Sequence, residues 1–125
     1  MMYLLLESWS LLLFFECVMQ FRDFRSLHSI VRSQPVVAHG SSVTVPSETL
    51  CHAVDLACVF YFKPVLCLQR SAATTVLLRR YGGCAELVIG AQVVPARSHA
   101  WVEVDGTVVN DKPYMLDLYK VIERC

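Results

Sequence analysis

The N-terminal segment Met1–Met19 is the feature that most limits how this chain can fold. It is largely apolar, but Glu7 and Glu16 interrupt it. A membrane-spanning helix needs about 20 nearly uninterrupted apolar residues, and a secretory signal opens with Lys or Arg and closes at small residues. The segment fits neither pattern. We therefore expect a helix that is apolar on most of its surface and is covered by the rest of the domain, by a partner protein or by a membrane surface.

The composition indicates one folded domain. The chain has 125 residues, of which 55% are hydrophobic and 18% are charged, whereas soluble domains average about 45–50% and about 25%. Such a chain can build a substantial core, which excludes a disordered tail. Its eleven basic residues balance its eleven acidic ones, and we find no basic stripe with interleaved aromatic residues, so we expect no nucleic-acid partner.

Six cysteines are present, and their spacing is not that of a metal site. None belongs to a Cys-x-x-Cys pair and no paired histidines accompany them, so we expect no metal. The even count allows disulfides, but a core this apolar does not need them. Because there is no secretory signal, we expect a reducing, cytoplasmic location in which most cysteines are small buried apolar residues. The six are Cys17, Cys51, Cys58, Cys67, Cys84 and Cys125.

Apolar residues at helical spacing dominate the first part of the chain. The predicted helical regions are residues 3–33 (in one or two pieces), Ser47 to about Phe62, and Cys67–Arg80. Residues 34–46 carry turn-forming residues and form a connection. We therefore divide the chain into an apolar helical arm and linker, residues 1–46, and a main domain, residues 47–125.

Strand patterns follow the helices. The predicted strands are residues 85–94, 98–104 and 107–111. Asp105-Gly106 between the last two is a hairpin signal. Residues 114–124 fit either a short strand or a terminal helix. Helices followed by strands predict an α+β fold with a small antiparallel sheet.

Cys67 is the cysteine best placed for chemistry. It lies in the first turn of a predicted helix, where unpaired N–H groups favour the thiolate, the nucleophilic form. By position alone, Cys67 is as readily a small buried apolar residue as a nucleophile. His99 near the start of one hairpin strand and Asp111 at the end of the next supply the other groups of a catalytic triad.

The hairpin can close in two registers. A two-residue loop pairs Val104 with Thr107 and leaves His99 and Asp111 on different faces. A three-residue loop pairs Glu103 with Thr107 and sets His99 opposite Asp111, with Cβ atoms about 4.5–5.5 Å apart. We predict the second register. Asp111 then accepts a hydrogen bond from one ring nitrogen, and the other nitrogen faces the thiol.

Four motifs in a fixed order, ending at Asp111, carry a family resemblance. They are Cys67-Leu68-x-Arg70-Ser71-Ala72, Leu77-Leu78-Arg79-Arg80-x-Gly82, Ala85-x-Leu87-x-Ile89-Gly90 and His99-Ala100-Trp101-Val102-Glu103. The chain resembles the transglutaminase-like cysteine proteases that remove the leader from lasso-peptide precursors. The resemblance implies a transglutaminase-like, papain-like fold, with N-terminal helices and a nucleophile helix packed on the small sheet.

The resemblance also implies roles for individual residues. Cys67 would be the nucleophile, His99 the general base and acid, and Asp111 the residue that orients the imidazole. Trp101 would form a wall beside the site, and Tyr61 and Gln69 are candidates for the second oxyanion donor. No metal and no bound cofactor are implied.

Partners follow from the same resemblance. Some relatives carry a fused leader-recognition module, and residues 1–46 are too few and too helical for one. The chain thus resembles the stand-alone peptidase, which acts on the precursor leader peptide with a separate leader-recognition protein and beside an ATP-using lasso cyclase. Residues 1–19 would be a docking surface, a peripheral membrane contact or simply part of the core.

Two other functions remain open. A transglutaminase-like acyltransferase or amidase would use the same triad on a different acceptor, so the acceptor, water or an amine, distinguishes it. A non-catalytic scaffold of a maturation complex would not need all three triad residues, and the presence of all three argues against it.

Overall fold

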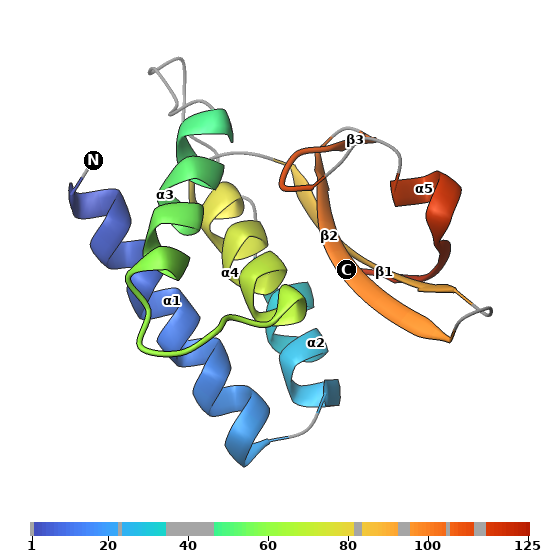
Figure 1. Ribbon diagram of the computed structural model, residues 1–125, viewed down its shortest axis with the longest axis horizontal. Coiled ribbons are helices and arrows are strands. Elements are labelled where there is room, and N and C mark those ends of the chain that lie inside the picture. The colour runs from blue at the N-terminus through green and yellow to red at the C-terminus, as the bar shows by residue number, and fades with distance from the viewer. Residues whose placement is uncertain are drawn as a thin grey trace.

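The computed structural model describes residues 2–22, 24–34, 47–81, 84–92, 96–104, 106–111 and 115–125. Its elements, in chain order, are α1 (Met2–Phe21), α2 (Phe24–Ser33), α3 (Ser47–Val59), α4 (Cys67–Arg80), β1 (Ala85–Gln92), β2 (Arg97–Val104), β3 (Thr107–Val108), α5 (Met115–Leu118) and β4 (Lys120–Arg124). The larger helices gather on one side of the sheet, and the short α5 lies on the other (Figure 1). The α+β fold predicted from the sequence is confirmed.

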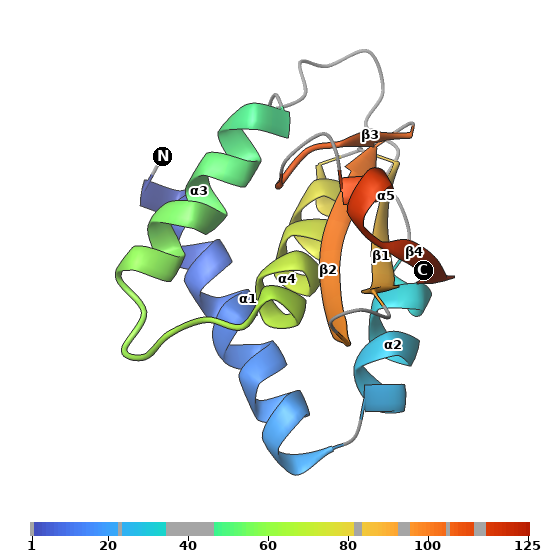
Figure 2. The same cartoon turned by 45° about the vertical axis from the view of Figure 1, so that its right-hand side comes forward.

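α4 is the central helix of the domain. It packs against α1 and α3 on one side and against β1 and β2 on the other (Figure 2). Two of its threonine hydroxyls are satisfied within the helix, because Thr74 and Thr75 donate to the carbonyls four residues earlier, at 2.8 and 2.9 Å. Ala72, Ala73 and Leu77 fill the interior of the domain. A helix covered on both sides is rigid, and this rigidity fixes the position of its first residue, Cys67.

α1 buries one face in the domain and exposes the other. Leu12 and Phe15 are fully buried in the same core cluster as residues of α3 and α4. The two glutamates that interrupt the apolar run form ion pairs, Glu16 with Lys63 at 3.1 Å and Glu7 with Arg80 at 4.0 Å. By length and composition alone α1 could cross a membrane, but its buried face is part of this core. The division at residue 46 stays a prediction.

The sheet is antiparallel, with strand order β3-β2-β1-β4. Side chains alternate across β2, so Ala100 and Val102 join the main core while Trp101 joins a smaller cluster with Val88 and Met115. α5, through Met115, thus covers the second face of the sheet. Residues 114–124, which fit either a helix or a strand by pattern, contain one of each in their described part.

Other element bounds differ modestly from the predicted ones. α3 ends at Val59 rather than near Phe62, and β1 ends at Gln92. α4 spans the predicted residues. The predicted third strand is much shorter, because β3 contains only Thr107–Val108. The predicted connection at 34–46 lies, apart from Gln34, outside the described residues.

Gly90 is packed too closely to accept a side chain. It pairs with His99 on the neighbouring strand, and a Cβ there would lie 2.6 Å from Trp101 Cη2 and 2.7 Å from Tyr119 Cβ. We expect Gly90→Ala to lower the free energy of unfolding by about 1–3 kcal/mol, because the indole must shift in a packed interior. Urea denaturation of both proteins measures this change. Unchanged stability would mean that the cluster around Trp101 is loosely packed.

Candidate active site

Cys67 is the first residue of α4 and is exposed. The preceding residue, Leu66, has extended backbone and makes no side-chain capping hydrogen bond. The apolar side chain of Leu66 therefore leaves the backbone N–H groups of the first turn uncapped. Their partial positive charge favours an anion at this end of the helix. The placement expected from the sequence, a cysteine at a helix start, is confirmed.

His99 and Asp111 form a close pair. The Nε2 atom of His99 lies 2.6 Å from Oδ2 of Asp111, with side-chain exposures of 25% and 18%. The imidazole also stacks on Tyr119, with ring centroids 5.5 Å apart and planes at 27°. Asp111 therefore orients the ring through Nε2, and Nδ1 is the nitrogen left for a thiol or a substrate.

The contact is the predicted one, but the predicted register is wrong. β2 and β3 pair Val104 with Thr107, the register we set aside, rather than Glu103 with Thr107. Asp111 still reaches His99 because β3 ends early. The side-chain oxygen of Asn110 accepts the Val102 N–H at 2.7 Å in place of a ladder bond. Because Asp111 lies beyond the end of β3, strand alternation does not determine the direction of its side chain.

Hydrogen bonds tie the first turns of α4 to the hairpin. Ser71 Oγ donates to the carbonyl of Ala100 at 3.0 Å, and Arg70 donates to the carbonyl of Asn110 at 2.8 Å. Ala100 follows His99 in the chain, and Asn110 precedes Asp111. The structure thereby brings the helix of Cys67 to the residues next to the His–Asp pair.

Within the described residues no hydrogen bond joins Cys67 directly to His99. β2 carries His99 on the sheet face that holds Trp101, whereas α4 packs on the opposite face. β3 pairs with β2 only at Glu103 and Val104 among these residues. Around His99, β2 is thus an edge strand among the described residues, and a thiol on α4 would have to reach the imidazole around that edge.

The other predicted site residues lie in the interior. Trp101 is fully buried, with its ring centroid 6.2 Å from that of His99, and its indole N–H donates to Glu103. Gln69 is buried and donates to the carbonyl of Leu12 in α1 at 2.8 Å. Tyr61 is also buried, and burial raises the pKa of its phenol to about 12. Trp101 lies next to His99, but the structure does not join Gln69 or Tyr61 to the His–Asp pair.

Sequence reasoning missed Asn110 and the roles of Arg70 and Ser71. Arg70, which reads as a solvated or capping residue, pairs with Asp55 of α3 at 2.8 Å as well as with the hairpin. Asn110 is buried and stands directly before Asp111. An amide side chain within a predicted strand is a sequence signal that could have drawn attention to this segment, because a buried amide needs hydrogen-bond partners.

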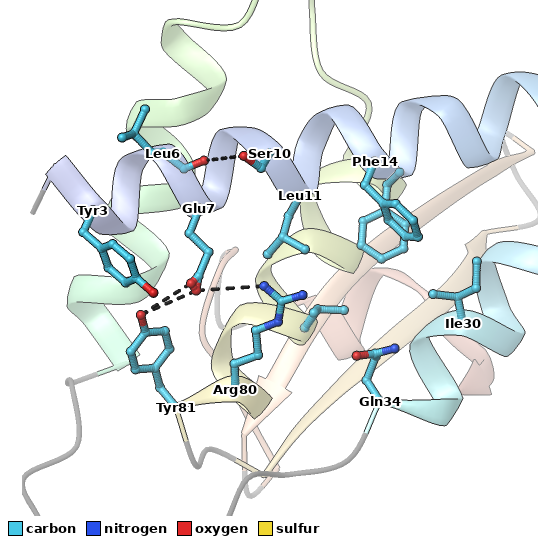
Figure 3. A pocket seen from close by; sticks show the side chains of 12 residues that line it. Tyr3, Leu6, Glu7, Ser10, Leu11, Phe14, Ile30, Gln34, Arg80 and Tyr81 are labelled. Carbon is cyan, nitrogen blue, oxygen red and sulfur yellow. Dashed lines mark hydrogen bonds and ion pairs between the residues drawn. The ribbon is translucent and has the colours of Figure 1, made fainter.

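A cavity of about 940 Å³ lies at the other end of α4. Figure 3 shows Glu7 of α1 between Tyr81 and Arg80, with apolar side chains of α1 and α2 along the rest of the wall. α4 begins at Cys67 and ends at Arg80, so this cavity is separate from the candidate active site. Among the described residues no group of three His, Cys, Asp or Glu side chains could hold a metal ion.

Comparison with known proteins identifies the superfamily of the chain. The family model of the transglutaminase-like superfamily matches residues 11–124 of this chain. The chain belongs to the transglutaminase-like superfamily. The match begins inside α1 and ends in β4, so it includes the three candidate catalytic residues and confirms the fold and superfamily expected from the motifs.

One curated relative is the Microcin J25-processing protein McjB of Escherichia coli, which is 46% identical over 56 residues. That alignment covers 45% of this chain and only 27% of the relative, so the chain matches less than a third of that protein's length. No solved structure matches the chain.

Proposed function

We propose that this transglutaminase-like protein is a cysteine peptidase that removes the leader from a lasso-peptide precursor. The observation that carries the proposal is the His99–Asp111 pair, held by hydrogen bonds beside the helix that begins at Cys67. The ordered motifs that resemble leader peptidases support it, as does the identity to a protein named for processing a microcin.

In the proposed reaction the Cys67 thiolate attacks the carbonyl carbon of the scissile peptide bond. The sulfur–carbon bond forms, the carbon–nitrogen bond breaks, and protonated His99 gives its proton to the leaving amine of the core peptide. Water then adds to the thioester carbon and loses a proton to His99. The carbon–sulfur bond breaks, which restores the Cys67 thiolate and releases the leader as a carboxylate. Asp111 keeps the ring oriented and stabilises its positive charge. The N–H of Cys67 at the helix start is a candidate oxyanion donor.

This mechanism requires Nδ1 of His99 to face the thiol around the edge of β2. The Asp111 contact at Nε2 is compatible with that orientation. The partners are proposals of the same kind: a leader peptide presented by a separate leader-recognition protein, with an ATP-using cyclase acting on the released core. The exposed face of α1, which includes Leu6 and Phe14, is a candidate docking surface.

Cleavage in H₂¹⁸O with an added primary amine tests the proposal. The folded chain, the leader-recognition protein and the precursor are incubated together, and the leader fragment is weighed by mass spectrometry. A peptidase gives a leader carboxylate carrying one ¹⁸O atom. A leader amide made from the added amine would instead identify an acyltransferase, and an uncut precursor would favour the scaffold.

A further inference from the structure

Asn110 lies at the centre of a hydrogen-bond network that the chemistry above does not use. Its side chain is part of a residue only 8% exposed. Oδ1 accepts the Val102 N–H of β2 at 2.7 Å, and Nδ2 donates to Ser71 Oγ of α4 at 3.1 Å. Its backbone carbonyl accepts from Arg70 at 2.8 Å. One residue thus joins β2, α4 and the segment that carries Asp111.

The direction of these bonds is fixed by chemistry. The Val102 N–H can only donate, so the amide oxygen of Asn110 must face it and the NH₂ group must face Ser71. Ser71 accepts that bond and donates its own hydrogen to the Ala100 carbonyl at 3.0 Å. The two hydrogen bonds therefore point the same way: Asn110 donates to Ser71, and Ser71 donates to Ala100. The amide of Asn110 supplies both an acceptor and a donor here, which neither a carboxylate nor an alkyl side chain can do.

The ends of the network lie beside the three candidate catalytic residues. Asn110 precedes Asp111, Ala100 follows His99, and Ser71 lies one helical turn after Cys67. We propose that Asn110, acting with Ser71, is a positioning residue that sets the separation between the Cys67 thiol and the His99–Asp111 pair. This inference rests on the proposed function.

Replacement of Asn110 breaks the network in predictable ways. Asn110→Ala leaves the Val102 N–H without its partner and frees the hairpin from Ser71. Asn110→Asp keeps the shape, but it removes the donor toward Ser71 and places a second carboxylate next to Asp111 in a buried position. Since a misplacement of about 1 Å can cost roughly 100-fold in rate, we expect Asn110→Ala to lower kcat about 10- to 100-fold, with KM changed by less than about twofold.

The test separates positioning from loss of stability. Wild type, Asn110→Ala, Asn110→Asp and Ser71→Ala are compared at a temperature where all are folded. Two rates are measured: precursor cleavage, and iodoacetamide labelling of Cys67 relative to the exposed Cys17 and Cys84 across pH. Val31→Ala is the matched control, because it removes fully buried volume in α2 away from the hairpin. We expect the control to lose stability but to keep wild-type labelling and cleavage, whereas the Asn110 variants label Cys67 more slowly than the wild type but still above the background of Cys17 and Cys84.

A double variant sharpens the result. If Asn110 and Ser71 form one link, Asn110→Ala combined with Ser71→Ala labels Cys67 no more slowly than Asn110→Ala alone. Strictly additive losses, or equal losses in Val31→Ala, would overturn the positioning role. The labelling rate can be measured without a substrate. If the wild type labels Cys67 selectively but does not cleave the precursor, the proposed peptidase function is contradicted and the positioning role is not. Unselective labelling of the wild type overturns both proposals.

Discussion

Cys67→Ala is expected to abolish leader removal, lowering kcat by at least about 10³-fold, because no other group in the proposed mechanism can form the acyl-enzyme. The substitution should hardly change stability. The thiol is exposed at a helix start, and exposed substitutions of this kind change the free energy of unfolding by about 0.5 kcal/mol or less. Precursor cleavage followed by mass spectrometry, together with thermal unfolding, measures both effects.

Cys84→Ala is the matched control for that variant, since Cys84 is also exposed and lies just before β1. It should cleave at the wild-type rate. Cleavage by Cys67→Ala at more than a few per cent of the wild-type rate would exclude Cys67 as the nucleophile.

Asp111→Asn is expected to lower kcat by about 10²- to 10⁴-fold with little loss of folded protein. The amide fits the space of the carboxylate, and the 2.6 Å contact to Nε2 can persist as a hydrogen bond. The neutral amide stabilises a protonated imidazole less than the carboxylate does, however, and it can hold the ring in the wrong tautomer. The variant should therefore bind precursor normally and cleave it slowly.

The conservative exchange Asp111→Glu provides the comparison for that prediction, because it keeps the charge but lengthens the side chain. We expect it to retain more activity than Asp111→Asn if charge is the main requirement. Equal cleavage by wild type and Asp111→Asn would show that the His99–Asp111 pair is structural.

Local signals in the sequence were sufficient for much of the fold. Pro64 before α4 and the paired arginines at its end mark a helix whose limits depend on few distant contacts, and those limits were predicted correctly. The α+β order followed from the change of apolar period along the chain. α1 was expected to be covered, but only the structure shows which face it buries.

Tertiary contacts decided what the sequence pattern could not. The hairpin register was predicted wrongly because it was chosen so that strand alternation would set His99 opposite Asp111. In the structure β3 ends early, and the side chain of Asn110 replaces a backbone partner, which strand periodicity does not include. The contact of His99 with Asp111 was therefore predicted correctly, but from a hairpin register that the structure does not have. Ser71 and Asn110 are far apart in the chain, and no local pattern links them.

Selective alkylation of Cys67 is the measurement that tests the triad most directly. The folded protein is treated with limiting iodoacetamide at mildly acidic pH, and labelled peptides are counted by mass spectrometry. Burial raises the pKa of Cys51 to about 11 and also raises the pKa of the Cys58 and Cys125 thiols. These three cysteines hold little thiolate below their pKa and should stay unlabelled, so exposed Cys17 and Cys84 set the background.

We predict that Cys67 reacts well above that background in the wild type and falls to it in His99→Ala, because an imidazolium partner sustains the thiolate at low pH. Labelling of Cys67 at the background rate, or selective labelling that survives His99→Ala, would contradict a catalytic pair of Cys67 and His99.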